Sequence, residues 1–435
     1  MKKQFRAKLE TVPDLQALAR SFPKKFPALL NSHIVNEITG RYSILFKKSK
    51  DIRFAYSQGQ LNRLFKKFDK KIPKSKKDFP LPFYSGWFLY LSYSAIKAWE
   101  TKLQNVKHDE RQPLALAFRS HSSIVIDHIK NQAWIVADSK KRLGKLKKIL
   151  LKQKTIPVSE NSQLKLQNDD VELYKNNVRK VIDYIKKGDV YQVNLARKWN
   201  IESKEKIDVF SLYQSLSKHN PAPFAGLLQT ENFSVISSSP ERLIKVENQV
   251  IETRPIAGTR PRGTDLEHDK LLIQELINHP KEQAEHIMLI DLERNDLGRV
   301  SRPGTVKVNE FMTIESYEKV HHIVSNVIGK LKKNTTYYDA IKSTFPGGTI
   351  TGCPKIHCME IIDELEDYPR GAYTGSFGYI TDDGRMDLNI LIRTFTLTNN
   401  ELTLHAGAGI VYDSIAENEA EESMHKARAL IKSLQ

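Results

Sequence analysis

The stretch "GSFGYITDDGRMDLNILIRTFTLTNNELTLHAGAGI", residues 375 to 410, decides the fold class. Its short runs of apolar and β-branched residues are separated by "DDGR" at 382–385 and "NNE" at 399–401, which are typical hairpin-turn residues. A tight hairpin joins two strands that run in opposite directions. The stretch therefore predicts antiparallel strands rather than parallel strands joined by helices.

Similar strand patterns continue in both directions from this stretch. Toward the N-terminus they occur in "RYSILF", "GWFLYLSY", "SSIVIDH", "QAWIVADS", "VYQVNLARKWNI", "FAGLLQ" and "FSVISSSP". The segment 170–189 has apolar residues at helical spacing and a stop at Gly188. Strands outnumber helix crossovers, so we expect an α+β fold with large, mainly antiparallel β-sheets flanked by helices, in two intertwined subdomains. Further helices are predicted at about 266–278, 280–295, 354–365 and 414–433.

The pattern of predicted strands and helices changes near segment 155–169. This segment is polar and has no apolar periodicity, which is typical of a connector. A chain of 435 residues exceeds the size at which one hydrophobic core usually stops growing. We therefore predict an N-terminal region over 1–165 and a second region over 170–433.

The net charge of +17 raises the question of a nucleic-acid partner. The two basic clusters, at 66–77 and 140–154, lack the interleaved aromatic residues of a base-stacking surface, so a solvated lysine-rich surface is the favoured interpretation. No apolar run approaches the length of a membrane span, and the first residues lack an apolar signal core. We expect a cytoplasmic protein that binds neither nucleic acid nor membrane, with Cys353 and Cys358 as reduced thiols.

Two pairs of acidic residues indicate a site for a hard divalent cation. Glu282 and Glu285 are spaced i, i+3 on one predicted helix, and Glu419 and Glu422 have the same spacing on another. If the two helix faces meet, they form a pocket of carboxylate oxygens, which are the ligands that Mg²⁺ prefers. Each pair taken alone is equally compatible with solvated glutamates on a helix surface.

Glycine-rich segments indicate close approach of a ligand to the main chain. "FPGGTITGCPK", residues 345 to 355, resembles an anion-binding loop that opens a helix, and "HAGAGIVYDS", residues 405 to 414, has small residues throughout. Neither contains the lysine–hydroxyl pair of a nucleotide-binding P-loop. Arg393 is expected in an apolar strand, where a buried guanidinium needs an anion such as a substrate carboxylate.

Three further features are ambiguous from the residues alone. His322 lies among apolar residues, where a structural role is as reasonable as a catalytic one. Glu241 follows a proline turn and is compatible with a surface carboxylate. "RPIAGTRPRG", residues 254 to 263, holds two prolines and two glycines and predicts a stiff, basic turn.

Together these segments resemble the chorismate-utilising enzymes, the family of the large subunits of anthranilate synthase and aminodeoxychorismate synthase and of isochorismate and salicylate synthases. The resemblance covers residues 188 to 430 in the expected order and is weaker in the N-terminal region. The motifs that carry it are "GDVYQVNLAR", "SSSPERL", "ETRPIAGTRPRG", "EHIMLIDLERNDLGRV", "VHHIVS", "FPGGTITGCPK", "YTGSFGYI", "LNILIRTF", "AGAGIVYDS" and "ENEAEESMHKA".

The resemblance implies a role for each candidate residue. Glu285 and Glu422 would hold Mg²⁺, supported by Glu282 and Glu419, and Glu241 would be the general acid that protonates the leaving C4 hydroxyl of chorismate. His322 is the position linked with proton removal during aromatisation, and Lys355 would add positive potential or order its loop. The residues that would hold the substrate are Thr349, Tyr373, Arg393, Gly407, Ala408 and Gly409.

Gln192 bears on the nucleophile. Family members that use water carry a lysine at this position, and that lysine activates the water. Glutamine cannot act as a general base, whereas ammonia is already a competent nucleophile. Gln192 therefore favours the ammonia-using branch over isochorismate and salicylate synthases.

The ammonia-using branch contains two activities, and the motifs divide between them. Aminodeoxychorismate synthases carry a lysine in "PIKGT" that attacks C2, whereas this sequence has Ala257 in "PIAGT", which favours anthranilate synthase. "YQVNLAR" and "FPGGTITG" are closer to aminodeoxychorismate synthase component I. "LLNS" at 29–32 and "NPAPFAG" at 220–226 depart from the motifs of tryptophan-inhibited anthranilate synthases. The balance favours aminodeoxychorismate synthase component I, with anthranilate synthase component I as the alternative.

No segment suited to glutamine hydrolysis is evident in the sequence. Cys353 lies inside the loop that the resemblance assigns to chorismate. We expect chorismate and ammonia as substrates, and a separate glutamine amidotransferase subunit as the source of ammonia.

Overall fold

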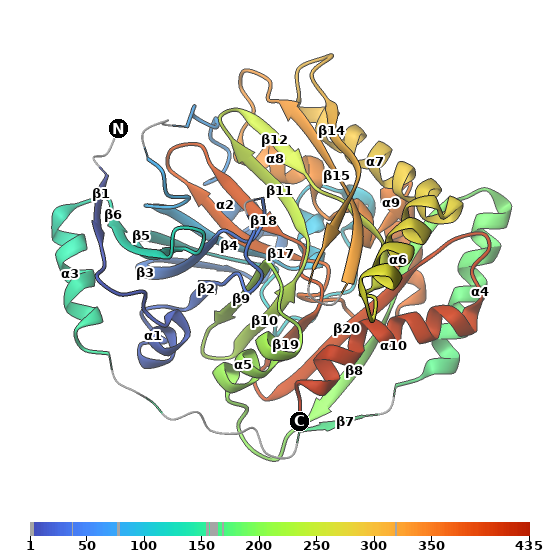
Figure 1. Ribbon diagram of the computed structural model, residues 1–435, viewed down its shortest axis with the longest axis horizontal. Helices are drawn as coiled ribbons and strands as arrows, with labels where there is room; N and C mark the ends of the chain where they lie inside the picture. The colour runs from blue at the N-terminus through green and yellow to red at the C-terminus, as the bar shows by residue number, and fades with distance from the viewer. Residues whose placement is uncertain are drawn as a thin grey trace.

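The strands of the computed structural model form one connected antiparallel sheet system with helices on its outside (Figure 1). The structure describes residues 4–36, 38–75, 79–153, 156, 164–167, 169–317 and 320–435. Every pair of strands in this part of the chain is antiparallel, as the hairpin-rich stretch predicted, so the α+β fold class is confirmed.

The N-terminal region contributes six strands and three α-helices. β5 is the central strand, because it pairs with β3 along one edge and with β4 and then β6 along the other. The strands are β1 (Phe5–Lys8), β2 (Ala28–Leu30), β3 (Tyr42–Ala55), β4 (Gly86–Leu91), β5 (Ala115–Asp127) and β6 (Gln132–Ala137). The helices are α1 (Leu15–Ser21), α2 (Gln58–Phe65) and α3 (Lys140–Leu150), with the 3₁₀ turns η1 (Tyr93–Ala98) and η2 (Thr101–Leu103).

The rest of the chain supplies the other strands and most of the helices. In Figure 1 helices α6, α7, α9 and α10 lie on the right and α1 and α3 lie toward the left. The strands are β7 (Lys165–Leu166), β8 (Gln192–Glu202), β9 (Phe224–Gln229), β10 (Phe233–Ser239), β11 (Arg242–Glu247), β12 (Val250–Thr253), β13 (Ile256–Pro261), β14 (Lys307–Ser316), β15 (Val320–Lys330), β16 (Gly352–Cys353), β17 (Ser376–Thr381), β18 (Met386–Asn389), β19 (Thr394–Thr398) and β20 (Glu401–Ile410). The helices are α4 (Val171–Lys187), α5 (Val209–His219), α6 (Leu266–Asn278), α7 (Pro280–Val300), α8 (Tyr337–Thr344), α9 (Lys355–Leu365) and α10 (Ala416–Lys432), with the 3₁₀ turn η3 (Gly348–Ile350).

Two rows of strands connect the N-terminal region to the rest. One row runs from β3 through β2, β9, β10, β19 and β20 to β8. The other runs from β5 through β4, β17, β18, β11 and β12 to β15, which also pairs with β13 and β14. The division of the chain at 165–170 stays a prediction, and the connector 155–169 lies mostly outside the described residues.

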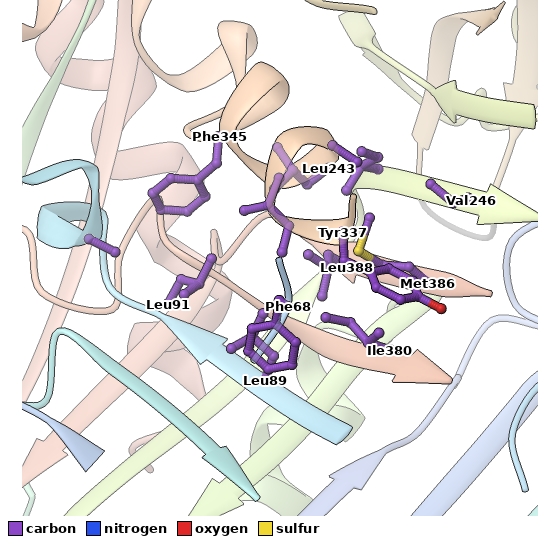
Figure 2. Packing of buried hydrophobic residues seen from close by; sticks show 14 of the residues in the cluster. Phe68, Leu89, Leu91, Leu243, Val246, Tyr337, Phe345, Ile380, Met386 and Leu388 are labelled. Carbon is purple, nitrogen blue, oxygen red and sulfur yellow. The ribbon is translucent and has the colours of Figure 1, made fainter. Parts of the chain in front are cut away.

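A large hydrophobic cluster packs where the second row meets the N-terminal strands (Figure 2). Leu89 of β4 and Leu388 of β18 converge there with Phe345, which follows α8. All three side chains are buried, so each contributes roughly 1.5–3 kcal/mol of burial free energy. This core fixes β11 and β18 beside α8 and thereby sets the position of the loop that carries Glu241.

Most predicted elements are confirmed, and two local predictions are wrong. Gly188 ends α4 in the left-handed conformation, with φ +83°, as the sequence indicated. "RPIAGTRPRG" is not a turn: Ile256–Pro261 forms β13, which is bulged between Ala257 and Thr259. Arg393 does not lie in a strand either, because it occupies a left-handed bend, with φ +53°, between β18 and β19. The prolines of "RPIAGTRPRG" favoured the prediction of a turn, and the apolar neighbours of Arg393 favoured the prediction of a strand.

Over the residues described, none of the helices is both long enough and apolar enough to cross a membrane.

Candidate active site

Glu241 is a buried acid at the junction of β10 and β11. Its side chain is only 5% exposed, and one carboxyl oxygen accepts a hydrogen bond of 2.8 Å from the Thr349 hydroxyl. Burial raises the pKa of Glu241 to about 8, and the neighbouring Glu293 carboxylate adds to this effect. The group therefore carries a proton at neutral pH, as a general acid requires.

The loop "FPGGTITGCPK" lies against β8 and supplies Thr349. Gly348 and Thr349 belong to η3, and the Asn194 side chain donates to the Thr349 carbonyl at 3.3 Å. Lys355 begins α9 with a buried side chain whose ammonium binds the Asp296 carboxylate and the Thr344 carbonyl. These contacts join α9 to α7 and to the end of α8, so they suit the role of ordering this loop.

Gln192 lies beside the glycine-rich strand β20. Strands β8 and β20 pair in register, with Gly409 opposite Asn194 and Gly407 opposite Ala196. A Cβ atom built on Gly409 would overlap the Gln192 side-chain amide, so the amide covers this glycine. Ala408, between the two glycines, is buried. The small residues let the Gln192 amide lie directly on the main chain.

Arg393 has no carboxylate partner among the described residues. Its guanidinium lies 3.5 Å from the Asn220 side-chain oxygen, and burial lowers its pKa. The nearby Tyr373 phenol, whose own pKa burial raises to about 12, is stacked on the His405 ring at 5.3 Å. A cation without a protein carboxylate partner is chemically suited to bind a ligand carboxylate.

His322 lies on β15 opposite Thr259 of the bulged strand β13. Its Nδ1 atom is 3.0 Å from the Thr259 hydroxyl, and its ring is near the Tyr317 ring. Burial lowers the pKa of His322 to about 4, and the charge of Arg393 acts in the same direction. The imidazole is therefore neutral and can accept a proton. Ala257 lies one pair further along, opposite Ile323.

The two acidic pairs, on α7 and α10, act on one another electrostatically. Burial raises the pKa of Glu285 to about 7, and the charges of Glu282, Glu422 and Glu419 raise it further. Burial also raises the pKa of Glu419, with Glu422 adding to the effect. The charges of the two pairs therefore influence one another, and the shared carboxylate pocket stays a prediction.

Each acidic pair has local cations. Glu282 binds Arg260 of β13 at 3.2 Å, Glu422 binds Lys426 at 2.6 Å, and Lys281 lies 3.9 Å from Glu285. Across the described ranges, no three potential ligand side chains already converge as a metal centre. The donor chemistry nevertheless fits Mg²⁺, because all four groups are hard oxygen ligands whose mutual repulsion a divalent cation relieves.

Sequence reasoning missed Glu293 and Asp296, two buried acids on α7. Both continue the face of the helix that carries Glu285, so the helical spacing offered a signal for them. It also missed that "LLNS" at 29–32 and "NPAPFAG" at 220–226, which helped to distinguish the two ammonia-using activities, line one cavity. That cavity, of about 640 Å³, is bordered by Leu30–Ser32 and Pro223–Ala225, and neither Glu241 nor the acidic pairs belong to its lining.

Comparisons with known proteins match most of the chain to one enzyme family. The family model described as chorismate binding enzyme matches residues 31–432. The chain is 44% identical over 359 residues to an anthranilate synthase component I-like protein of Synechocystis sp., covering 82% of this chain and 74% of that protein. It is 48% identical over 260 residues to aminodeoxychorismate synthase component 1 of Bacillus subtilis, covering 59% and 54% respectively.

Among solved structures, anthranilate synthase component I from Streptococcus pneumoniae TIGR4 superposes with a TM-score of 0.79 at 33% identity. The match covers 91% of this chain and 93% of that one.

Proposed function

The chain belongs to the chorismate-binding enzymes, and from that premise we propose that it is aminodeoxychorismate synthase component I. It would join ammonia to chorismate at C4 with loss of the C4 hydroxyl as water, giving 4-amino-4-deoxychorismate for 4-aminobenzoate and folate biosynthesis. A separate glutamine amidotransferase subunit would supply the ammonia.

The observation that carries amination is Gln192, whose amide lies on Gly409 at the strand that borders the site. An amide has no basic nitrogen and cannot remove a proton from water. Ammonia needs no such base. Glutamine at position 192 thus supports ammonia, rather than an activated water, as the nucleophile.

The residues of the site divide the work between an acid and several binding groups. Glu241 donates its proton to the departing C4 oxygen, and Thr349 orients the Glu241 carboxyl through its hydroxyl. Arg393 binds the enolpyruvyl carboxylate, with Tyr373 beside it. Gly407 and Gly409 would contact the ligand through their main chain, beside the Gln192 amide that covers Gly409.

The two acidic pairs offer the hard oxygen ligands that Mg²⁺ prefers. Glu285 and Glu422 would hold it, with Glu282 and Glu419 in direct or water-mediated support. When bound, the ion would supply a positive charge for the ring carboxylate of chorismate. Lys281, Lys426 and Arg260 now accompany three of these glutamates.

Anthranilate synthase component I is the second candidate. Ala257 favours it, and several similar proteins carry that name or a related one. In that reaction the amine bond forms at C2, the C4 hydroxyl leaves, and pyruvate is eliminated after a base removes the C2 proton. His322, neutral and half-buried, would be that base.

Product identification separates the two candidates. Chorismate, Mg²⁺ and an ammonium salt are incubated with the enzyme, with and without the lyase that converts aminodeoxychorismate to 4-aminobenzoate. We expect 4-aminobenzoate only when the lyase is added. Fluorescent anthranilate with an equal amount of pyruvate would instead establish the second candidate, and isochorismate formed without ammonia would overturn amination.

A further inference from the structure

Glu293 is a buried acid for which the proposed reaction has no role. It lies on α7 and is 4% exposed. Its carboxyl accepts hydrogen bonds from the Thr253 hydroxyl and from the main-chain N–H of Gly348. The next residue, Thr349, donates to Glu241. Two consecutive residues of η3 therefore hold two buried carboxyl groups.

We propose that Glu293 is a positioning residue that keeps Glu241 protonated in the working enzyme, by placing a second carboxylate on the same η3 turn. The inference rests on the proposed role of Glu241 as the acid. A negative charge close to a buried carboxyl disfavours its ionisation, because two like charges in a weakly polar interior repel strongly.

The other charges around the two groups leave this repulsion in place. Asp296 and Lys355 face Glu293, but they bind each other, so the lysine is already matched. Lys426 of α10 is the cation that faces Glu241, and it is bound to Glu422. In the described part of the chain, Glu293 has no lysine or arginine within ion-pair distance.

The order of ionisation is consistent with this role. Burial, helped by Asp296, raises the pKa of Glu293 to about 7, and burial raises that of Glu241 to about 8. Glu293 accepts two hydrogen bonds and faces the Lys355 ammonium, whereas Glu241 accepts one hydrogen bond, from Thr349, so the surroundings favour the charged form more at Glu293. Its charge is present over the range in which Glu241 would otherwise lose its proton.

Glu293→Gln separates charge from geometry. The glutamine oxygen can still accept from Thr253 and Gly348, and the side chain keeps its size, so η3 stays in place. We expect the high-pH limb of kcat to move to lower pH by about one unit, with kcat below that limb unchanged. The assay uses saturating chorismate and Mg²⁺ and a constant concentration of free ammonia.

Two variants serve as comparisons. Asp291→Asn removes an exposed charge from the same helix and should leave the pH profile unmoved. Glu293→Ala removes the hydrogen bonds to η3 as well and should lower kcat at every pH. If Glu293→Gln shows the wild-type profile, or lowers kcat equally at every pH as Glu293→Ala does, the inference is wrong.

A second measurement does not depend on turnover. The C=O stretching band of protonated Glu241, assigned by its disappearance in Glu241→Gln, is titrated by infrared spectroscopy. We expect its midpoint at lower pH in Glu293→Gln than in wild type, and an unchanged midpoint would overturn the inference. Failure of the wild type to aminate chorismate would overturn the proposed function alone.

Discussion

At the residue scale, Glu241 links stability to catalysis. Its pKa is raised by burial to about 8 in the folded protein, whereas the unfolded chain ionises this carboxyl in the ordinary acidic range. The stability that the protonated group contributes is fully present below the unfolded pKa. It is lost as the pH rises through about 8.

Glu241→Gln should therefore have opposite effects on activity and on stability. We expect kcat to fall by about 10²–10⁴-fold, because the proton donor is gone. The melting temperature should equal that of wild type at about pH 5 and exceed it at about pH 9, because glutamine has no proton to lose. Calorimetry at the two pH values checks this. Glu231→Gln, on an exposed turn, is the control and should change neither quantity.

Ala257 tests whether a covalent lysine is dispensable. Intact-mass measurement during turnover should show no chorismate-derived adduct on wild type, since no lysine occupies this position on β13. Ala257→Lys places an amine there and should give an adduct with chorismate, whereas Ala257→Met, of similar bulk, should not. An adduct on wild type would show that another residue performs the covalent step.

At the element scale, the bulge in β13 lets Glu282 approach the strand. Gly258 has φ +64°, and a Cβ atom on it would lie 2.9 Å from a carboxylate oxygen of Glu282. Gly304 has a similar φ of +72° but open space around it. The two glycines therefore share a backbone conformation and differ in what surrounds them.

Substituting each glycine by alanine distinguishes the effect of backbone strain, which both variants share, from the displacement of Glu282, which only Gly258→Ala causes. Both Gly258→Ala and Gly304→Ala should lose roughly 1 kcal/mol of unfolding free energy through left-handed strain. Only Gly258→Ala should raise, several-fold, the Mg²⁺ concentration that gives half-maximal activity. Equal Mg²⁺ dependence in the two variants would remove Glu282 from the metal site.

Helices α7 and α10 together should form the metal site. EDTA should abolish turnover and added Mg²⁺ should restore it, and Glu285→Gln and Glu422→Gln should each remove most activity. Glu417→Gln, which changes an exposed glutamate of α10 bound to Arg179, is the matched control. Full activity in a metal-free assay would contradict this assignment.

The elements also show what the sequence could predict. Helical spacing located α4, α6, α7, α9 and α10, and hairpin turns located β17 to β20, because those signals are local. β13 was missed because its prolines and glycines imitate a turn, whereas its pairing with β15 is a long-range interaction. Glu293 was missed because a buried carboxylate is defined by neighbours from other elements, here Thr253 and Gly348.

At the scale of the whole molecule, the N-terminal region completes the sheet of the rest. β2 pairs with β9, and β4 pairs with β17. A chain that begins near residue 170 would expose the edges of β9 and β17, and an unpaired apolar edge promotes aggregation. We expect such a truncated protein to be insoluble, and the full chain to unfold in one cooperative transition by calorimetry. A soluble, folded truncation would contradict this.

The pairing of strands that are distant in the sequence also affects how the protein folds during its synthesis. The Ser32 hydroxyl donates a hydrogen bond to the Pro223 carbonyl, which is synthesised 191 residues later. The Ser85 hydroxyl donates to the Asp382 carboxylate, which is synthesised 297 residues later. At a synthesis rate of about 5–20 residues per second, the second interval is roughly 15 to 60 seconds. During that time the nascent β2 and β4 leave the ribosome with vacant edges. We therefore expect the yield of active enzyme to depend on co-translational chaperones more than on the stability of the finished fold.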